Sequence, residues 1–418
     1  MTEPNHMQWL HQIADFIGEY PGRNPGYSPQ ALMADLRKHF GLKKTDAEKL
    51  VQLMSREMNR FVLASLELNL TFHCNLACEY CFVHNRSPED RMDFVTAAKA
   101  IDLLLTQGYP NVTITLIGGE PLLEFELIQK IVPYALENAQ KRNIAVEWAV
   151  TTNGTLINEA MLAFFSKYRI NLLLSLDGGP ETHDRYRKTK NGEGTWQQIV
   201  ALIPLLRQYQ GWLGARMTVS IEAVDSMRQD FRQLVDLGIN QFIIAPAQGA
   251  RLWSQEEIRR YSLGLAAIQQ DYYALKEAGA SLYIEEFETV IKPDGSWGCQ
   301  AGATSLAVAP NGDVSPCSKL LGLTSKKGQC IIGNVHSGID YGLLAPFQIS
   351  KSRHLPQCSQ CSHPCNGGCY AVNYEQTGDH FTPSEENCRF WAVHQEIARW
   401  VKIAAKDDDC SSYSNSVV

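Results

Sequence analysis

A chain of 418 residues that is 44% hydrophobic and 20% charged is long enough for two or three domains and a sizeable core. A formal net charge of −7 gives no electrostatic reason to expect a nucleic-acid partner, and apolar runs such as 170–176 are too short to cross a bilayer. Because the N-terminus lacks the basic start and apolar core of a secretory signal, the twelve cysteines indicate metal or redox chemistry in the cytoplasm.

The first 61 residues are predicted to form a helical region. Apolar residues recur at helical spacing over 7–20, and a second helix is expected over 29–40 after a turn rich in proline and glycine. Thr45, followed three residues later by Glu48, is typical of a capping box at the start of a third helix. This region either packs as a cap on the core, which is the commoner role, or docks a partner.

Residues 62–250 alternate between apolar runs and helical patterns. The first helix is expected to begin at Ser87, because a hydroxyl cap there precedes proline and acidic residues. Alternation of this kind favours a parallel sheet with right-handed crossovers, and six units indicate a partial (β/α)6 TIM-like barrel. An open doubly wound sheet is the alternative. The strands are predicted at 64–72, 112–117, 146–152, 170–176, 215–222 and 241–246.

Three cysteines, Cys74, Cys78 and Cys81, follow the first predicted strand in the pattern C-x3-C-x2-C. Three thiolates on one loop can hold three corners of an iron–sulfur cube and leave the fourth iron open to another ligand. A structural zinc knuckle usually shows two pairs of ligands, and a set of disulfides needs an even number of cysteines. The spacing therefore favours an iron–sulfur cluster with one open coordination position over these two alternatives.

Polar or glycine-rich motifs follow each of the first four predicted strands. The cysteine loop follows the first strand, 118–121 the second, 151–154 the third and 175–179 the fourth. Any one of them could be ordinary turn chemistry, since Asn-Gly and Asp-Gly are common in turns. In barrels of this type the active site lies at the carboxyl ends of the strands. Four such motifs at successive strand ends therefore indicate one shared site.

The cysteine loop resembles the signature of radical S-adenosylmethionine (SAM) enzymes, and the strand-end motifs are similar to those of the same superfamily. In these enzymes SAM chelates the fourth iron, and an electron from the cluster cleaves SAM to a 5′-deoxyadenosyl radical. The resemblance implies SAM and a [4Fe-4S] cluster held by Cys74, Cys78 and Cys81. The residues expected to contact SAM are Tyr80, Gly118, Gly119, Glu120, Pro121, Thr152, Asn153, Ser175, Asp177 and Arg187.

Each of these residue types suits SAM in a different way. The two glycines would let the backbone approach a ligand. The polar side chains at 152–153 and 175–177 would bind its ribose and amino-acid end. Tyr80 is expected near the adenine. Arg187 would clamp the SAM carboxylate in a bidentate fork, with a surface arginine as the alternative.

Residues 251–298 are predicted to connect the barrel, by a long helix from Trp253 to Gly279, to a small C-terminal domain over 299–404. A helix over 387–404 would close this domain, and the acidic, serine-rich segment 405–418 is predicted to be disordered. Cys410 lies in that segment and is excluded as a metal ligand. The density of cysteines indicates a domain held together by metal. They are Cys299, Cys317, Cys330, Cys358, Cys361, Cys365, Cys369 and Cys388.

This cysteine spacing resembles the SPASM extension of radical SAM peptide-modifying enzymes, which houses two auxiliary [4Fe-4S] clusters and would bring the total to three. The gap before the third cysteine of the central run is three residues here and usually five in the family. Cys330 lies outside the seven-cysteine pattern and is expected as the fourth ligand of the first cluster, the alternative being an open iron. A two-zinc ribbon is the alternative for all eight thiolates. The resemblance implies Cys299, Cys317 and Cys369 for the first auxiliary cluster, and Cys358, Cys361, Cys365 and Cys388 for the second.

The resemblance also implies a function, namely radical SAM maturation of a ribosomally synthesised precursor peptide by crosslinking, epimerisation or excision. The expected partners are that peptide, a flavodoxin or ferredoxin as electron donor, and a separate leader-recognition protein, since the first 60 residues look helical rather than like a winged helix. Anaerobic sulfatase maturation, which generates formylglycine, is the nearest rival. Against it, Ser318 stands where those enzymes typically carry an aspartate base. A non-catalytic electron-transfer scaffold would not need the four strand-end motifs.

Overall fold

The structure is a computed structural model. It describes residues 12–13, 16, 20, 29–58, 63–83, 90–107, 109–249, 251–288, 299–323, 330–348, 355–361, 365 and 367–409. Within these ranges, no helix combines the length and the apolar character that crossing a bilayer would require.

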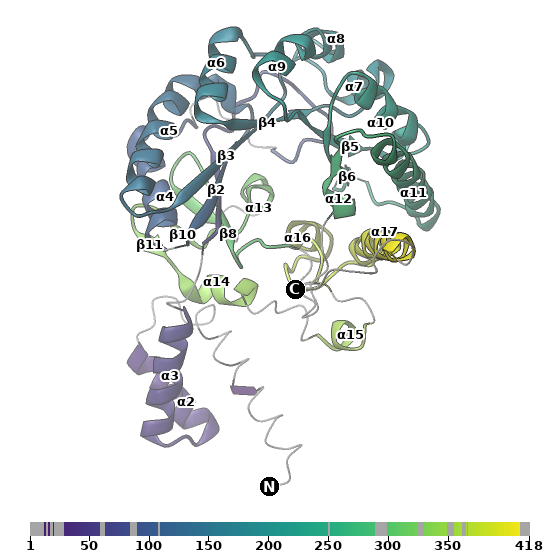
Figure 1. Cartoon of the computed structure of the whole chain (residues 1–418). Coiled ribbons are helices and arrows are strands. Elements are labelled where there is room, and N and C mark those ends of the chain that lie inside the picture. The colour runs from purple at the N-terminus through teal and green to yellow at the C-terminus, as the bar shows by residue number, and fades with distance from the viewer. Residues whose placement is uncertain are drawn as a thin grey trace.

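Six parallel strands form the centre of the molecule, in the order in which they occur in the chain. Along β2 and β3, buried side chains alternate with partly exposed ones. The sheet curves, and helices lie along the outside of the curve (Figure 1). The sheet is not closed, so the predicted partial barrel is confirmed. The strands are β1 (Ser65–Asn69), β2 (Asn111–Ile117), β3 (Ala145–Thr152), β4 (Ile170–Ser175), β5 (Gly214–Val219) and β6 (Gln241–Pro246).

The sheet continues beyond these six strands at both edges, which the sequence patterns did not reveal. β7 (Tyr283–Ile284) pairs in parallel with β6. At the other edge, β8 (Ser305–Val308) pairs in parallel with β1, so the cysteine-rich region begins as a neighbour of the first barrel strand. Three short antiparallel strands then extend this edge, namely β9 (Asp313–Ser315), β10 (Gly333–Asn334) and β11 (Gly338–Ile339).

Helices cover the outer face of the barrel (Figure 1). The first of them begins at Phe94, where the Asp93 side chain accepts a hydrogen bond from the Thr96 amide, and not at Ser87 as predicted. Ser87 itself lies outside the described residues, but Asp90 and Arg91 are not helical. The helices are α4 (Phe94–Thr106), α5 (Phe125–Gln140), α6 (Glu159–Tyr168), α7 (Pro180–Tyr186), α8 (Trp196–Val200), α9 (Ile203–Tyr209), α10 (Met227–Asp236) and α11 (Gln255–Glu277), with short 3₁₀ turns η1 (Pro121–Glu124) and η2 (Ile221–Ala223).

Of the helices described after β7, the last four lie below the open side of the barrel (Figure 1), and the final one is α17 (Glu385–Asp409). α17 packs along α11, and the rings of Trp253, Tyr261 and Phe390 meet edge to face at this contact. α17 also runs to Asp409, beyond the predicted end at residue 404. The helices are α12 (Glu285–Glu288), α13 (Ser318–Gly322), α14 (Tyr341–Gln348), α15 (Pro356–Ser359), α16 (Tyr370–Thr377) and α17 (Glu385–Asp409).

Two N-terminal helices, α2 (Pro29–Phe40) and α3 (Lys44–Met58), stand apart from the barrel (Figure 1). Both were predicted within one residue of their observed starts. Their buried residues Leu32, Leu36 and Val51 form an apolar cluster with Ile13 and Tyr20 that is separate from the barrel core. The predicted helix over 7–20 lies largely outside the described residues.

Candidate active site

The loop that carries Cys74, Cys78 and Cys81 leaves the carboxyl end of β1 and is held by its backbone on two sides. The amides of Gly119 and Glu120 donate to the carbonyl oxygens of Thr71 (2.7 Å) and His73 (2.9 Å). On the other side, the Ala77 amide donates to the Lys188 carbonyl (2.8 Å). The three thiols therefore have a backbone position fixed by the ends of neighbouring strands.

The pair Gly118 and Gly119 is required by this backbone contact. A Cβ atom at Gly118 would lie 2.2 Å from the Thr71 carbonyl oxygen, and one at Gly119 would lie 2.1 Å from that of His73. Gly118 also has a φ of 143°, which L side chains rarely adopt. The two glycines thus make room for the backbone of the cysteine loop, and their predicted approach to SAM stays a prediction.

Glu120 joins the ends of β2 and β3. Its buried carboxylate accepts hydrogen bonds from the Thr152 hydroxyl (2.8 Å) and from the amides of Asn153 (2.8 Å) and Leu122 (3.0 Å). Burial raises the pKa of this carboxyl to about 7, although the three donors act in the opposite direction. Glu120 and Thr152 therefore bond to each other, and their predicted contacts with SAM stay predictions. Pro121, in the same motif, begins η1 and is buried.

Asn153 brings the third strand-end motif to the cysteine loop. Its Nδ2 lies 3.8 Å from Cys74 Sγ and donates to Asn75 Oδ1 (2.8 Å). The Leu76 amide lies 3.4 Å from the same sulfur. Donors that face a thiolate sulfur stabilise its charge and orient it toward a metal. Asn75 had no predicted role. Its Nδ2 donates to the Thr155 hydroxyl (2.8 Å) and so extends this hydrogen-bond network to the segment after β3.

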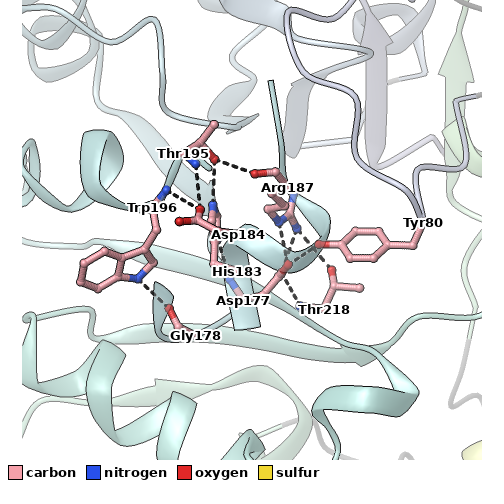
Figure 2. A network of polar contacts seen from close by, with 9 residues as sticks. All are labelled: Tyr80, Asp177, Gly178, His183, Asp184, Arg187, Thr195, Trp196 and Thr218. Carbon is pink, nitrogen blue, oxygen red and sulfur yellow. Dashed lines mark hydrogen bonds and ion pairs between the residues drawn. The ribbon is translucent and has the colours of Figure 1, made fainter. Parts of the chain in front are cut away.

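A second polar network ties the cysteine loop to the fourth and fifth strands (Figure 2). The guanidinium of Arg187 makes a two-pronged contact with Asp177, with Nε donating to Oδ2 (2.8 Å) and Nη2 to Oδ1 (2.9 Å). Both side chains are buried. The Thr218 amide donates to Asp177 Oδ1 (3.0 Å), and the Tyr80 hydroxyl donates to Oδ2. The Arg187 fork is thus directed at a carboxylate of the chain, and its contact with SAM stays a prediction.

Tyr80 lies between two cysteines of the loop and is packed as well as hydrogen-bonded. The Arg187 guanidinium stacks over its ring, 5.3 Å from the centroid, and Tyr186 lies against it at 5.5 Å between ring centroids. Burial raises the pKa of the Tyr80 phenol well above its ordinary value. The tyrosine therefore remains protonated and fastens the cysteine loop to Asp177.

His183, Asp184 and Thr195 hold Arg187 in place and had no predicted role (Figure 2). His183 Nδ1 faces the Asp177 amide at 3.4 Å, and its Nε2 lies 3.0 Å from the Thr195 hydroxyl, which donates to the Arg187 carbonyl (3.1 Å). Asp184 accepts from the Thr195 amide (2.8 Å). Burial lowers the pKa of His183 to about 4, so this ring is neutral at neutral pH. Ser175, another residue predicted to contact SAM, is the last residue of β4 and pairs with Arg216 of β5.

The C-terminal cysteines fall into two groups. Burial, reinforced by the neighbouring Cys369, raises the pKa of Cys299 to about 12. Burial also raises the pKa of Cys317 well above its ordinary value, with Cys299 and Cys369 as its thiol neighbours. The structure therefore brings Cys299, Cys317 and Cys369 together.

The second group lies around the N-terminal end of α17. Burial raises the pKa of Cys388 to about 11, and Cys365, Cys358 and Cys361 add to the effect. Burial raises the pKa of Cys358 as well, with Cys365 and Cys361 nearby. The two groups are the same two sets that the SPASM resemblance implied. Within the described ranges no three Cys, His, Asp or Glu side chains converge closely enough to hold one metal ion, so the grouping rests on these mutual interactions and the ligand roles stay predictions.

Comparison with known proteins agrees with this geometry. The model of the radical SAM superfamily matches residues 68–235. An uncharacterised protein of Methanocaldococcus jannaschii is 31% identical over 53% of this chain and 82% of its own length. A serine-type anaerobic sulfatase-maturating enzyme of Klebsiella aerogenes is 26% identical over 71% and 77%. The subtilosin biosynthesis protein AlbA of Bacillus subtilis is 24% identical over 80% and 72%.

Two solved structures share the fold over more of the chain than the barrel alone. One is anSMEcpe with bound AdoMet and the Cp18Cys peptide, with a TM-score of 0.67 and 19% identity, covering 82% of this chain and 99% of that one. The other is Streptococcus suis SuiB bound to its precursor peptide SuiA, with a TM-score of 0.55 and 18% identity, covering 82% and 80%. The chain belongs to the radical SAM superfamily, as the cysteine loop indicated. It is therefore an enzyme that uses SAM and a [4Fe-4S] cluster.

The residues at the barrel mouth fit this cofactor pair. Three thiols lie on one short loop, with Asn153 and the Leu76 amide facing the sulfur of Cys74. Three thiolates leave one iron without a protein ligand. That iron would be open to SAM, which supplies the radical chemistry when it is bound. Cys74, Cys78 and Cys81 are thus the residues of this chain that would hold the cluster.

Proposed function

We propose that this enzyme is a radical SAM peptide maturase with two auxiliary [4Fe-4S] clusters, which modifies a side chain or the backbone of a ribosomally made precursor peptide. When bound, SAM and its cluster supply a radical that abstracts hydrogen from the substrate. The chain's own residues hold the cysteine loop, shape the substrate space and carry the auxiliary ligands. Relatives and fold neighbours that act in peptide biosynthesis or bind precursor peptides, AlbA and SuiB among them, support this assignment.

The observation that carries the proposal is the link between the two cysteine regions across the barrel interior. Glu67 and Asn69 alternate on β1 with the buried Leu66 and Leu68. The Ser318 amide, directly after Cys317, donates to Glu67 Oε2 (2.8 Å), and Asn69 Nδ2 donates to the Ser318 hydroxyl (2.9 Å). Thus β1 carries the loop of Cys74, Cys78 and Cys81 at its carboxyl end, and two of its own side chains bind the residue that follows Cys317.

The inner face of the barrel supports a large substrate. Its partly exposed inward positions carry small side chains such as Thr115, Ala149 and Thr218, together with the larger Ile117, Leu173 and Ile243. An open sheet with this mixed lining suits a peptide segment that presents both polar and apolar groups. A separate leader-recognition protein and a flavodoxin or ferredoxin complete the proposed set of partners.

Anaerobic sulfatase maturation is the second candidate, favoured by the names of the relatives that are similar over most of the chain. The position after Cys317 weighs against it. Ser318 is buried, its hydroxyl accepts from Asn69, and an aliphatic hydroxyl is not a base at neutral pH. A formylglycine-forming reaction would therefore need a different base.

The test uses anaerobically reconstituted enzyme with SAM and dithionite. Formation of 5′-deoxyadenosine and methionine is expected, and a variant with alanine at Cys74, Cys78 and Cys81 should form neither. Mass spectrometry then compares short peptides encoded beside the enzyme's gene with a sulfatase-derived peptide. Modification of the first and not the second supports peptide maturation. Conversion of a Cys or Ser of the sulfatase peptide to formylglycine would reverse the order of the two candidates.

A further inference from the structure

The eighth cysteine of the C-terminal region, Cys330, has a structural position that its sequence spacing does not reveal. Strands β9 and β10 pair antiparallel, with Val314 opposite Gly333. Cys330 precedes Gly333 by three residues and Cys317 follows Val314 by three, so both cysteines lie beyond the same end of this strand pair. The Ile332 amide still donates to the Val314 carbonyl (2.8 Å), so the pairing reaches within two residues of Cys330. The two cysteines therefore leave the sheet at the same end.

The side chains around Cys330 also place it near the thiols of the first auxiliary group. Its side chain is 7% exposed and lies in one apolar cluster with Leu320, Phe347 and Tyr370. The three thiols of the first auxiliary group, Cys299, Cys317 and Cys369, pack against that same cluster. A fourth thiol thus lies among the same apolar side chains as the other three.

One polar side chain faces the sulfur of Cys330. His380 Nε2 lies 3.4 Å from Cys330 Sγ, within the range of an N–H···S hydrogen bond. The His380 ring stacks on Tyr374 with 4.4 Å between centroids, and Asn373 Nδ2 donates to the His380 carbonyl (3.0 Å). Tyr374 and Asn373 belong to α16, which begins directly after Cys369. The same helix therefore positions both the histidine and one of the three grouped thiols.

We propose that Cys330 supplies the fourth thiolate of the first auxiliary cluster and that His380 Nε2–H donates a hydrogen bond to its sulfur. This inference rests on the auxiliary clusters of the proposed function. Four thiolates leave no iron open to the substrate, so this cluster is restricted to passing single electrons. A hydrogen bond to a ligating sulfur disperses negative charge, which favours the reduced cluster and raises its reduction potential.

The ligand assignment is tested on the anaerobically purified holoenzyme with Cys330→Ala, matched by Cys410→Ala as a control cysteine outside the cluster region. Iron and sulfide per chain and the EPR spectrum of the dithionite-reduced protein are measured. Cys330→Ala is expected to lose iron or to change the EPR signal of one cluster, while Cys410→Ala matches the parent enzyme. An unchanged iron content and spectrum in Cys330→Ala would overturn the assignment.

The hydrogen bond from His380 is tested separately, in variants that keep all cysteines. This test can therefore be carried out even if Cys330→Ala does not fold. His380→Leu is compared with His336→Leu, a histidine exposed in the β10–β11 turn. In protein labelled with ¹⁵N-histidine, pulsed EPR should show a weakly coupled nitrogen that is lost only in His380→Leu. Redox titration should move one cluster to a more negative potential in that variant, with unchanged iron content. Retention of both the coupling and the potential would overturn the role of His380.

These readouts need neither SAM nor a peptide, so the two proposals can fail separately. An enzyme that modifies no peptide but shows the expected changes in Cys330→Ala and His380→Leu would reject the peptide function and keep the cluster assignment. Iron for a single cluster per chain would reject both the auxiliary sites and this inference, while cleavage of SAM would still be expected.

Discussion

The two cysteine regions of this enzyme are built on different physical principles. At the barrel mouth, the loop of Cys74, Cys78 and Cys81 is held by hydrogen bonds between strand ends, centred on the buried carboxylates of Glu120 and Asp177. In the C-terminal region, the first auxiliary thiols lie instead against a cluster of apolar and aromatic side chains. We therefore expect the mouth to keep its shape without iron, and the C-terminal region to depend on the metal of the proposed auxiliary clusters.

Removal of iron should separate the two regions most strongly. In protein freed of iron by chelation under reducing conditions, amides over 355–388 are expected to exchange at least about 100-fold faster, because local opening is no longer opposed by metal ligation. Amides of β2–β5 should change by only a few-fold, since their contacts involve no thiol. Hydrogen exchange by mass spectrometry measures both. Equal acceleration of amide exchange in the two regions would contradict the expected difference in their dependence on iron.

Loss of the Asp177 carboxylate should be the most damaging single change at the mouth. Asp177→Ala leaves the buried Arg187 without its partner, which typically costs about 3–5 kcal/mol of unfolding free energy. Asp225→Ala, which breaks the solvent-exposed pair with Arg260, should change the free energy of unfolding very little, because water screens exposed ion pairs. Urea denaturation measures both. In Asp177→Ala, SAM-induced changes in the cluster spectrum should also be lost, because Tyr80 loses its anchor to β4.

Glu120 gives the mouth a predicted dependence on pH. Its pKa is about 7 in the folded state and about 4.5 when exposed, so the folded state binds the proton more tightly. The contribution of Glu120 to the free energy of unfolding is therefore fully present below about pH 4.5. It is lost as the pH rises toward 7 and above, by up to roughly 3 kcal/mol. Glu120→Gln should remove this part of the slope. Denaturation curves of both proteins at pH 5 and pH 8 test the sign, and parallel pH profiles would show that Glu120 does not titrate in this range.

Gly119→Ala should have the smallest of these effects on stability. The added methyl meets the backbone of the cysteine loop, and overpacking of this kind costs about 1–3 kcal/mol. Gly211→Ala is the matched control, because a Cβ there meets no atom within 4 Å. The specific readout is the iron content of the first cluster, which should fall only in Gly119→Ala. Normal iron content with lowered stability would mean that the contact supports the fold but not the thiols.

Much of the architecture was predictable because it depends on local patterns. The alternation of apolar runs with helical periods located β1–β6 within a few residues, and the four strand-end motifs do lie on neighbouring strands. The pairing of β8 with β1 joins segments far apart in sequence, and no local pattern indicates it. The start of α4 at Phe94 was missed since the stronger-looking cap at Ser87 was preferred over Asp93.

The individual roles of the mouth residues were less predictable than their location. Polar residues near a cofactor can bind it directly or bind one another, and a sequence does not distinguish these cases. Thr152 with Glu120, and Arg187 with Asp177, bind one another here. The role of His183 could not be predicted for the same reason. It depends on a contact between its ring in α7 and the hydroxyl of Thr195, which lies before α8.

The parallel pairing of Ser65 with Ser305 has a consequence for biosynthesis. About 240 residues separate the two partners, which a ribosome adds in roughly 12–50 seconds at 5–20 residues per second. Throughout that interval one side of β1 presents unpaired amides and carbonyls, the kind of strand border that recruits other chains. Slow translation or delayed release should therefore favour aggregation of the nascent enzyme, and a chaperone that shields this border would raise the yield of folded protein.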